Sequence, residues 1–92
     1  MRVDALLTEG INREIRKKII DSRKVLRLTQ GKVAMKAQLM GLDLTEDQMS
    51  KIETGVRRVT VSELFFIAKI LNIDLDSLAM RAVLGGEAAR SV

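Results

Sequence analysis

The chain has 92 residues, of which 47% are hydrophobic, so one small domain with a packed core is expected rather than disorder. It contains no cysteine and no histidine, which excludes disulfides, thiolate or imidazole metal ligands, and nucleophilic catalysis by Cys or a Ser–His pair. The net charge of +4 is a mild indication of an anionic partner.

The composition favours a bundle of short helices. Proline is absent and only two residues are aromatic, so aliphatic side chains and alanine must build the core. No segment approaches the roughly 20 apolar residues that span a bilayer, and the N-terminus lacks a long apolar stretch. We therefore expect a cytoplasmic protein with no membrane contact, no metal and no cofactor.

The first helix is predicted from about Asn12, as its N-cap, to about Arg27. Its apolar positions recur at helical spacing, with basic residues between them. Residues 1–11, with Gly10 close to their end, are expected to form an N-terminal arm or a short extra helix.

Thr29 is positioned to cap a second helix that begins at Gln30. Gly41 is a natural stop for it because glycine adopts positive φ without penalty. Leu42 and Leu44 of the connector are then able to reach the core. The apolar face of this helix is expected at Val33, Ala34, Ala37 and Leu39 or Met40.

A third helix is predicted between Thr45 and Gly55. Thr45-Glu46-Asp47-Gln48 reads as a capping box, in which the Thr side chain accepts from the Gln48 amide and Gln48 reaches back. Met49 and Ile52 give this helix its inward face.

Thr60 and Glu63 form a second capping box that opens a fourth helix, and Asn72 suits its end. Its buried stripe is expected at Leu64, Phe65, Ala68 and Leu71.

Asp74 caps a short fifth helix in the same interpretation. Residues 81–92 are expected to form a C-terminal tail that is either flexible or part of a dimer contact. The prediction is thus an all-α fold: a compact bundle of about five short helices, with its main domain at residues 12–80. Its second and third helices have the outline of a helix-turn-helix.

Three stretches, read together, resemble a known family. They are "RKVLRLTQGKVA", "TEDQMSKIETG" and "RRVTVSELFFIAKILNIDLDSL", and they look like the phage-repressor-like (Cro/cI, XRE-type) helix-turn-helix domains. The match covers roughly residues 13–80 and implies a lambda-repressor-like DNA-binding domain. The second helix looks about a turn longer than in the shortest members, and the third opens with acidic residues where members more often have Gln, Arg, Ser or Thr.

The resemblance implies roles for individual residues. An ion pair between Arg23 and Glu53 is expected to hold the third helix at one angle. With that helix in the major groove, the candidate base contacts are Glu46, Asp47, Ser50 and Lys51. The candidate phosphate contacts are Thr29, Gln30, Lys32, Gln48, Arg57 and Arg58.

Each assignment has a simpler alternative. Glu46 and Asp47 are stabilised by the dipole of any helix that they open, so they need not read bases. Thr29 caps its helix whatever else it does, and the basic turn at Arg57 and Arg58 is equally compatible with simple solvation.

The sequence therefore predicts a DNA-binding transcriptional regulator of bacterial or phage type, which binds double-stranded DNA as a homodimer. Two apolar sets outside the helix-turn-helix are candidates for the dimer contact: Val3, Leu6 and Leu7, or Leu78, Met80, Val83 and Leu84. The alternative is a protein-interaction module, antitoxin-like or anti-regulator, whose third helix binds a protein partner. An enzyme is not expected, because no catalytic grouping or glycine-rich phosphate loop is present.

Overall fold

The computed structural model describes residues 3–84, with side chains from Leu7 onward. This part of the chain is all-helical and contains no strand, which confirms the predicted all-α class. Its helices are α1 (Val3–Val25), α2 (Gln30–Leu39), α3 (Glu46–Thr54), α4 (Val61–Leu71) and α5 (Leu75–Leu84). Residues 85–92 of the predicted tail lie outside the described range, as do the side chains of Val3 and Leu6. In the described part, no helix has the length and apolar character needed to cross a membrane.

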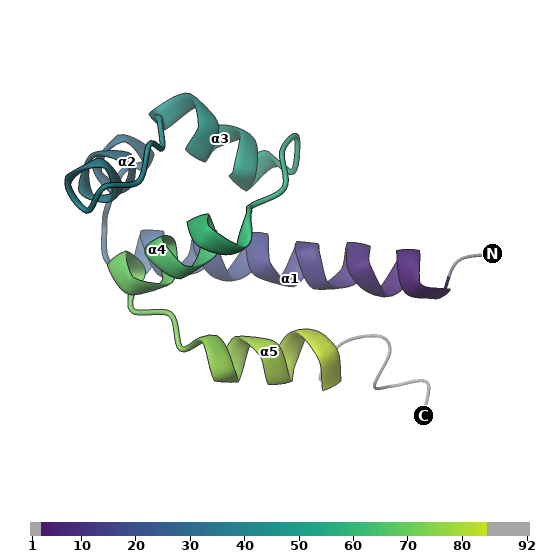
Figure 1. Ribbon diagram of the computed structural model, residues 1–92. Coiled ribbons are helices and arrows are strands. Elements are labelled where there is room, and N and C mark those ends of the chain that lie inside the picture. Colours follow the sequence, from purple (N-terminus) through teal and green to yellow (C-terminus); the bar gives the residue numbers. More distant parts are fainter. Residues whose placement is uncertain (1–2, 85–92) are drawn as a thin grey trace.

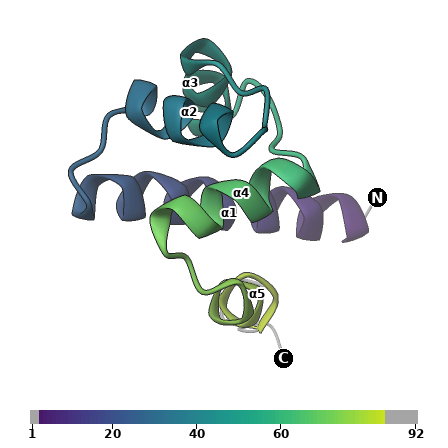
Figure 2. The same ribbon diagram turned by 60° about the vertical axis from the view of Figure 1, so that its left-hand side comes forward.

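The long helix α1 is the central element of the bundle. α3, α4 and α5 all pack against it, with α2 and α3 on one side and α5 on the other (Figures 1 and 2). The core lies where these helices meet and is aliphatic, as predicted. Its largest fully buried side chains are Ile19, Val33, Leu44, Met49, Ile52 and Ile67.

The predicted start of the first helix is wrong. α1 begins at Val3 and continues through Gly10, so Asn12 lies inside the helix instead of capping it, and residues 3–11 are not a separate arm. A glycine inside a helix costs only about 1 kcal/mol relative to alanine, which weakens a helix without ending it. α1 ends at Val25 because Arg27 adopts a left-handed conformation, with φ of 57°.

The predicted caps of the other helices are confirmed. Thr29, Thr45 and Thr60 each cap the helix that follows, and the last two form complete capping boxes with Gln48 and Glu63. Gly55 and Asn72 end α3 and α4 in the left-handed conformation. Asp74 accepts hydrogen bonds from the amides of residues 76 and 77 at the start of α5.

Predicted core positions at two places, on α4 and at the end of α2, face solvent instead. On α4, Phe65 is 59% exposed, and Ile67 is buried in its place because α4 turns its 63–67–71 stripe toward the bundle. On α2, Leu39 is 82% exposed and Met40 is also exposed, because the last turn of the helix extends past the core. α5 continues to Leu84, so residues 81–84 are its last turn and not part of a tail.

Candidate nucleic-acid interface

The segment between α2 and α3 is held in one conformation by short contacts. Gly41 takes positive φ (102°), the Leu42 amide donates to the carbonyl of Ala37 at 2.9 Å, and Leu44 is fully buried. The side chain of Gln38 donates to the carbonyl of Leu44 at 2.6 Å. α3 therefore leaves α2 along a fixed path.

Glu53 ties α3 to the rest of the bundle. The Arg23 guanidinium donates from Nε and Nη2 to the two carboxylate oxygens of Glu53, at 2.7 Å and 2.8 Å, and from Nη1 to the carbonyl of Leu28. This confirms the expected ion pair. The Gln30 amide donates to the same carboxylate at 3.0 Å, so Glu53 links three helices. Burial would raise the pKa of Glu53, but the bonds from Arg23 and Gln30 outweigh it and hold the pKa below its ordinary value.

The role of Gln30 in this network was missed by the sequence interpretation. The position was assigned to a DNA phosphate, but in the structure its amide nitrogen donates to Glu53 and the residue is half-buried. Arg23 lies in the last turn of α1 and Gln30 begins α2, and nothing in the spacing shows that their side chains meet on one carboxylate. A contact to phosphate by Gln30 stays a prediction.

Arg57 likewise has a partner within the protein. Its two terminal nitrogens bind the two carboxylate oxygens of Glu63 as a fork, with Nη1 at 2.9 Å from Oε1. These bonds lower the pKa of Glu63, burial opposes them, and the bond from the Thr60 amide adds to the lowering. The Arg57 side chain is about one-third exposed. It anchors the turn after α3 to the first turn of α4, a role that its position in a basic turn did not reveal.

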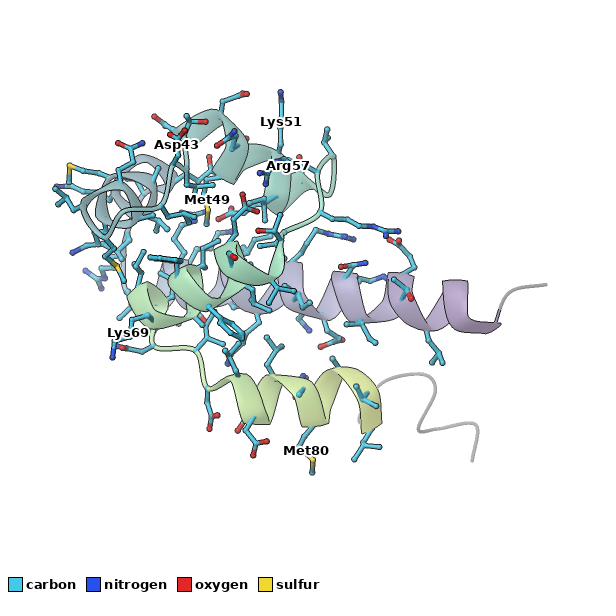
Figure 3. All side chains as sticks on the ribbon, in the orientation of Figure 1. Asp43, Met49, Lys51, Arg57, Lys69 and Met80 are labelled. Carbon is cyan, nitrogen blue, oxygen red and sulfur yellow. The ribbon has the colours of Figure 1, made fainter. Side chains whose placement is uncertain are left out.

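The outer side of α3 carries the predicted base contacts. Glu46, Asp47 and Lys51 are exposed, and Ser50 is half-buried. Lys51 projects away from the bundle, and its Nζ lies 3.1 Å from Oδ2 of Asp47, one turn earlier (Figure 3). Both side chains are largely exposed, so the pair is weak and open to exchange with another ion.

Glu46 reaches across to the start of α2. A Cβ on Gly31 would lie only 3.1 Å from Oε1 of Glu46, so the carboxylate rests against the first turn of α2. That turn carries free amides and the positive end of the helix dipole, which favour a nearby anion. In this arrangement a glycine at residue 31 leaves room for the carboxylate.

The side chains of the remaining predicted phosphate contacts differ in whether they already have a partner within the protein. Lys32 and Arg58 are exposed and form no ion pair within residues 7–84. The side chains of Thr29 and Gln48 are occupied in caps. Asp43, which the sequence interpretation left out, lies on the same side as Lys51 and adds negative charge there (Figure 3).

No group of three or more His, Cys, Asp or Glu residues in the described part of the chain is placed to hold a metal ion. Comparison with family models, with curated proteins and with solved structures gave no match for the chain.

Proposed function

We propose that the chain is a sequence-specific DNA-binding transcriptional regulator in which α2 and α3 act as a helix-turn-helix. The observation that carries the proposal is the way α3 is presented: a short helix capped at both ends, locked to α1 and α2 through Glu53, with a polar outer side in solvent. A helix of this kind fits the major groove of B-DNA, which is about 12 Å wide.

Lys32 and Arg58 are the cations best placed to meet phosphates. They lie in the first turn of α2 and in the turn after α3, and neither is committed to a carboxylate in the described residues. Phosphate contacts of this kind fix the register of a helix in the groove, and base contacts then select the sequence. One such domain covers little DNA, so we propose a dimer on a paired site.

Binding to a labelled duplex that carries the gene's own upstream region, compared with random DNA across a salt series, tests the proposal. We expect preference over random DNA, with Lys32→Ala and Arg58→Ala each weakening binding to every duplex. Each should lower the slope of log affinity against log salt by about 0.9.

Lys18→Ala is the matched control for these substitutions. Lys18 is an exposed cation of α1 that lies near enough to Asp74 to help lower the pKa of that carboxyl, at the start of α5 and away from α3. Its removal should leave the salt slope unchanged. Weak binding without preference, at low salt as well, would contradict the proposal.

A protein partner is the second candidate function, and the placement of the acidic residues favours it. Asp47 meets the charge of Lys51, Glu46 rests where a phosphate would approach α2, and Glu63 meets the charge of Arg57. The surface of α3 therefore has less free positive charge than the net charge of the chain suggests. In this candidate, α3 packs against a protein in place of DNA.

The double substitution Glu46→Gln with Asp47→Gln separates the two functions. If the carboxylates only oppose phosphate, affinity for all duplexes should rise and the salt slope should steepen. If they accept from cytosine amines, preference at particular base pairs should relax. No DNA affinity in either form would leave the protein partner as the function of α3.

A further inference from the structure

The turn between α3 and α4 is bonded to both helices through one residue, Arg57. Its backbone amide donates to the carbonyl of Lys51 in α3 at 3.1 Å. Its guanidinium forks onto the carboxylate of Glu63 in the first turn of α4, with Nη1 at 2.9 Å from Oε1. Glu63 is buried and also accepts from the amide of Thr60, the cap of α4. Arg57 therefore ties the turn to the helix before it and to the helix after it.

Two further contacts hold the same turn. Gly55 ends α3 with φ of 82°, and a Cβ there would lie 3.2 Å from Cζ of Arg16. The Arg16 guanidinium, which comes from α1, thus rests on the start of the turn. Val59, near the other end, is partly buried against the core. The backbone on both sides of Arg58 is therefore held by neighbouring parts of the bundle.

Arg58 differs from Arg57 in its surroundings. The Arg58 side chain is exposed and forms no ion pair within residues 7–84, whereas the Arg57 side chain is only about one-third exposed. In Figure 3, Lys51 projects away from the bundle and Arg57 lies nearer to it. Of two adjacent arginines, one is bound within the protein and the other is presented to solvent.

We propose that Arg57 and Glu63 are positioning residues for DNA binding: the pair places Arg58 for a phosphate, and Arg57 itself makes no DNA contact. This inference rests on the proposed function and divides the predicted phosphate contacts of the turn between two different roles. A turn that is ordered before binding spares the complex the conformational entropy that its ordering would otherwise cost.

The burial of Glu63 is the reason that Arg57 stays on it. A phosphate would have to draw the guanidinium away and leave a buried carboxylate without its cation, which is costly. Only 7% of the Glu63 side chain is exposed, and the bonds from Arg57 are the main cause of its lowered pKa. Arg58 has no such carboxylate to leave in the described residues, so it is free to meet a phosphate.

A double-mutant cycle tests the proposal, with a labelled duplex of the gene's own upstream region across a salt series. Arg58→Ala should lower the slope of log affinity against log salt by about 0.9. Arg57→Ala should weaken binding about tenfold but leave the slope unchanged, because Arg58 still reaches its phosphate after paying for its own ordering. In the double variant the loss should equal that of Arg58→Ala alone, because Arg57 acts through Arg58.

A phosphate contact by Arg57 itself would give a different result. The two losses would then add, and the slope of the double variant would fall by about twice 0.9. That outcome would overturn this inference and leave the proposed function standing, whereas a wild type that binds no DNA would overturn both.

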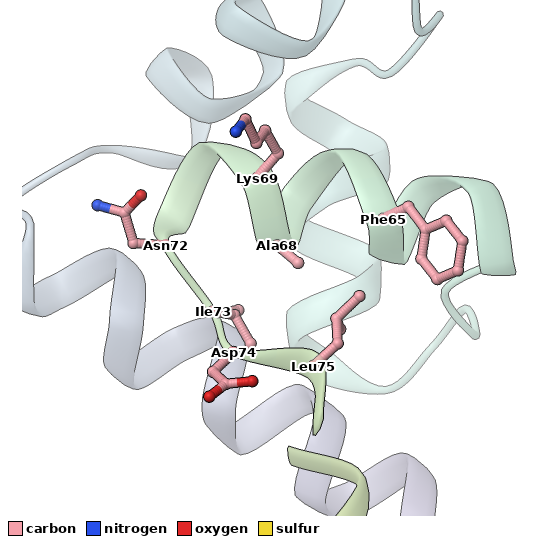
Figure 4. A pocket seen from close by; sticks show the side chains of 7 residues that line it. All are labelled: Phe65, Ala68, Lys69, Asn72, Ile73, Asp74 and Leu75. Carbon is pink, nitrogen blue, oxygen red and sulfur yellow. The ribbon is translucent and has the colours of Figure 1, made fainter. Parts of the chain in front are cut away.

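Lys69→Ala is the matched control for the loss of one positive charge. Lys69 is an exposed cation in the last turn of α4, beside an open hollow between α4 and the start of α5 (Figure 4). It lies at the opposite end of α4 from Glu63. Its removal should leave the salt slope unchanged.

Nuclear magnetic resonance of the free protein provides a readout that needs no DNA. In the wild type, the heteronuclear NOE of the backbone amides at positions 58 and 59 should match that of α3 and α4. It should fall in Arg57→Ala and in Glu63→Gln, and remain unchanged in Arg58→Ala and Lys69→Ala. Arg57→Lys, which keeps the charge and loses the fork, replaces Arg57→Ala if that variant loses its helical circular dichroism. A turn that is equally ordered without the fork would overturn the proposal.

Discussion

Glu53 and Glu63 are the two buried carboxylates of the described chain, and each receives the fork of one arginine. A buried charge of this kind is tolerated only when it is paired and its lone pairs accept hydrogen bonds. Both have additional donors, from Gln30 and from the Thr60 amide, and both pKa values lie below the ordinary glutamate value. Stability is therefore linked to pH through these two groups, and also through Asp74, whose pKa is lowered chiefly by the hydrogen bond from Ser77.

The fold should lose stability in acid. A carboxyl whose pKa is lower in the folded state contributes stability above its unfolded pKa of about 4.3, and this is lost as pH falls through the folded value. Urea denaturation between pH 7 and pH 2 should show a constant stability down to about pH 5 and a decline below it. In Glu63→Gln the decline should be shallower, because one of the linked groups is gone. An equally steep decline in that variant would contradict this assignment.

Arg27 is strained where α1 ends. A residue other than glycine in the left-handed conformation costs about 1–2 kcal/mol, and Arg27 has φ of 57°. Arg27→Gly should therefore raise stability by about 0.5–1 kcal/mol, or the melting temperature by several degrees. Lys24→Gly, in the last turn of the same helix, should lower stability by a similar amount. Thermal melts of the two variants decide the point, and a lower melting temperature for Arg27→Gly would disprove it.

At the scale of elements, the ion pair between Arg23 and Glu53 joins α3 to α1, in addition to the buried contacts of Met49 and Ile52. Removing one partner of a buried pair leaves a stranded charge, so Arg23→Met should cost about 3–5 kcal/mol. Arg23→Met combined with Glu53→Leu should recover much of the loss, because no charge is then left unpaired. Glu9→Gln is the control: Glu9 pairs with Arg16 at 3.9 Å on the surface and should matter little. Denaturant titrations measure all four proteins, and a double variant no better than Arg23→Met would contradict this account.

The helix boundaries show where local sequence signals were sufficient. The starts of α2, α3 and α4 were predicted correctly because a threonine side chain and an amide three residues later make each cap, and such contacts are local. The start of α1 was not, because Gly10 reads as a stop although the helix tolerates it. The partners of Gln30 and Arg57 also escaped prediction, since each depends on where other helices are placed.

At the scale of the whole molecule, periodicity predicted the class of fold and most of the core. Periodicity could not show which side of a helix faces inward when both sides carry apolar residues. α4 has Glu63, Ile67 and Leu71 on one side and Val61 and Phe65 on another, and packing against α1 and α2 decided between them. The DNA-binding role of α3 stays a prediction that rests on how this helix is presented.

The three threonine caps also have a kinetic consequence. Each cap forms between residues only three positions apart, so its formation closes a short loop at a small cost in chain entropy. The bond between Arg23 and Glu53 spans 30 positions and must await the docking of α1. In terms of transition-state structure, substitutions at the caps should slow folding more than substitutions at Glu53, which should mainly speed unfolding.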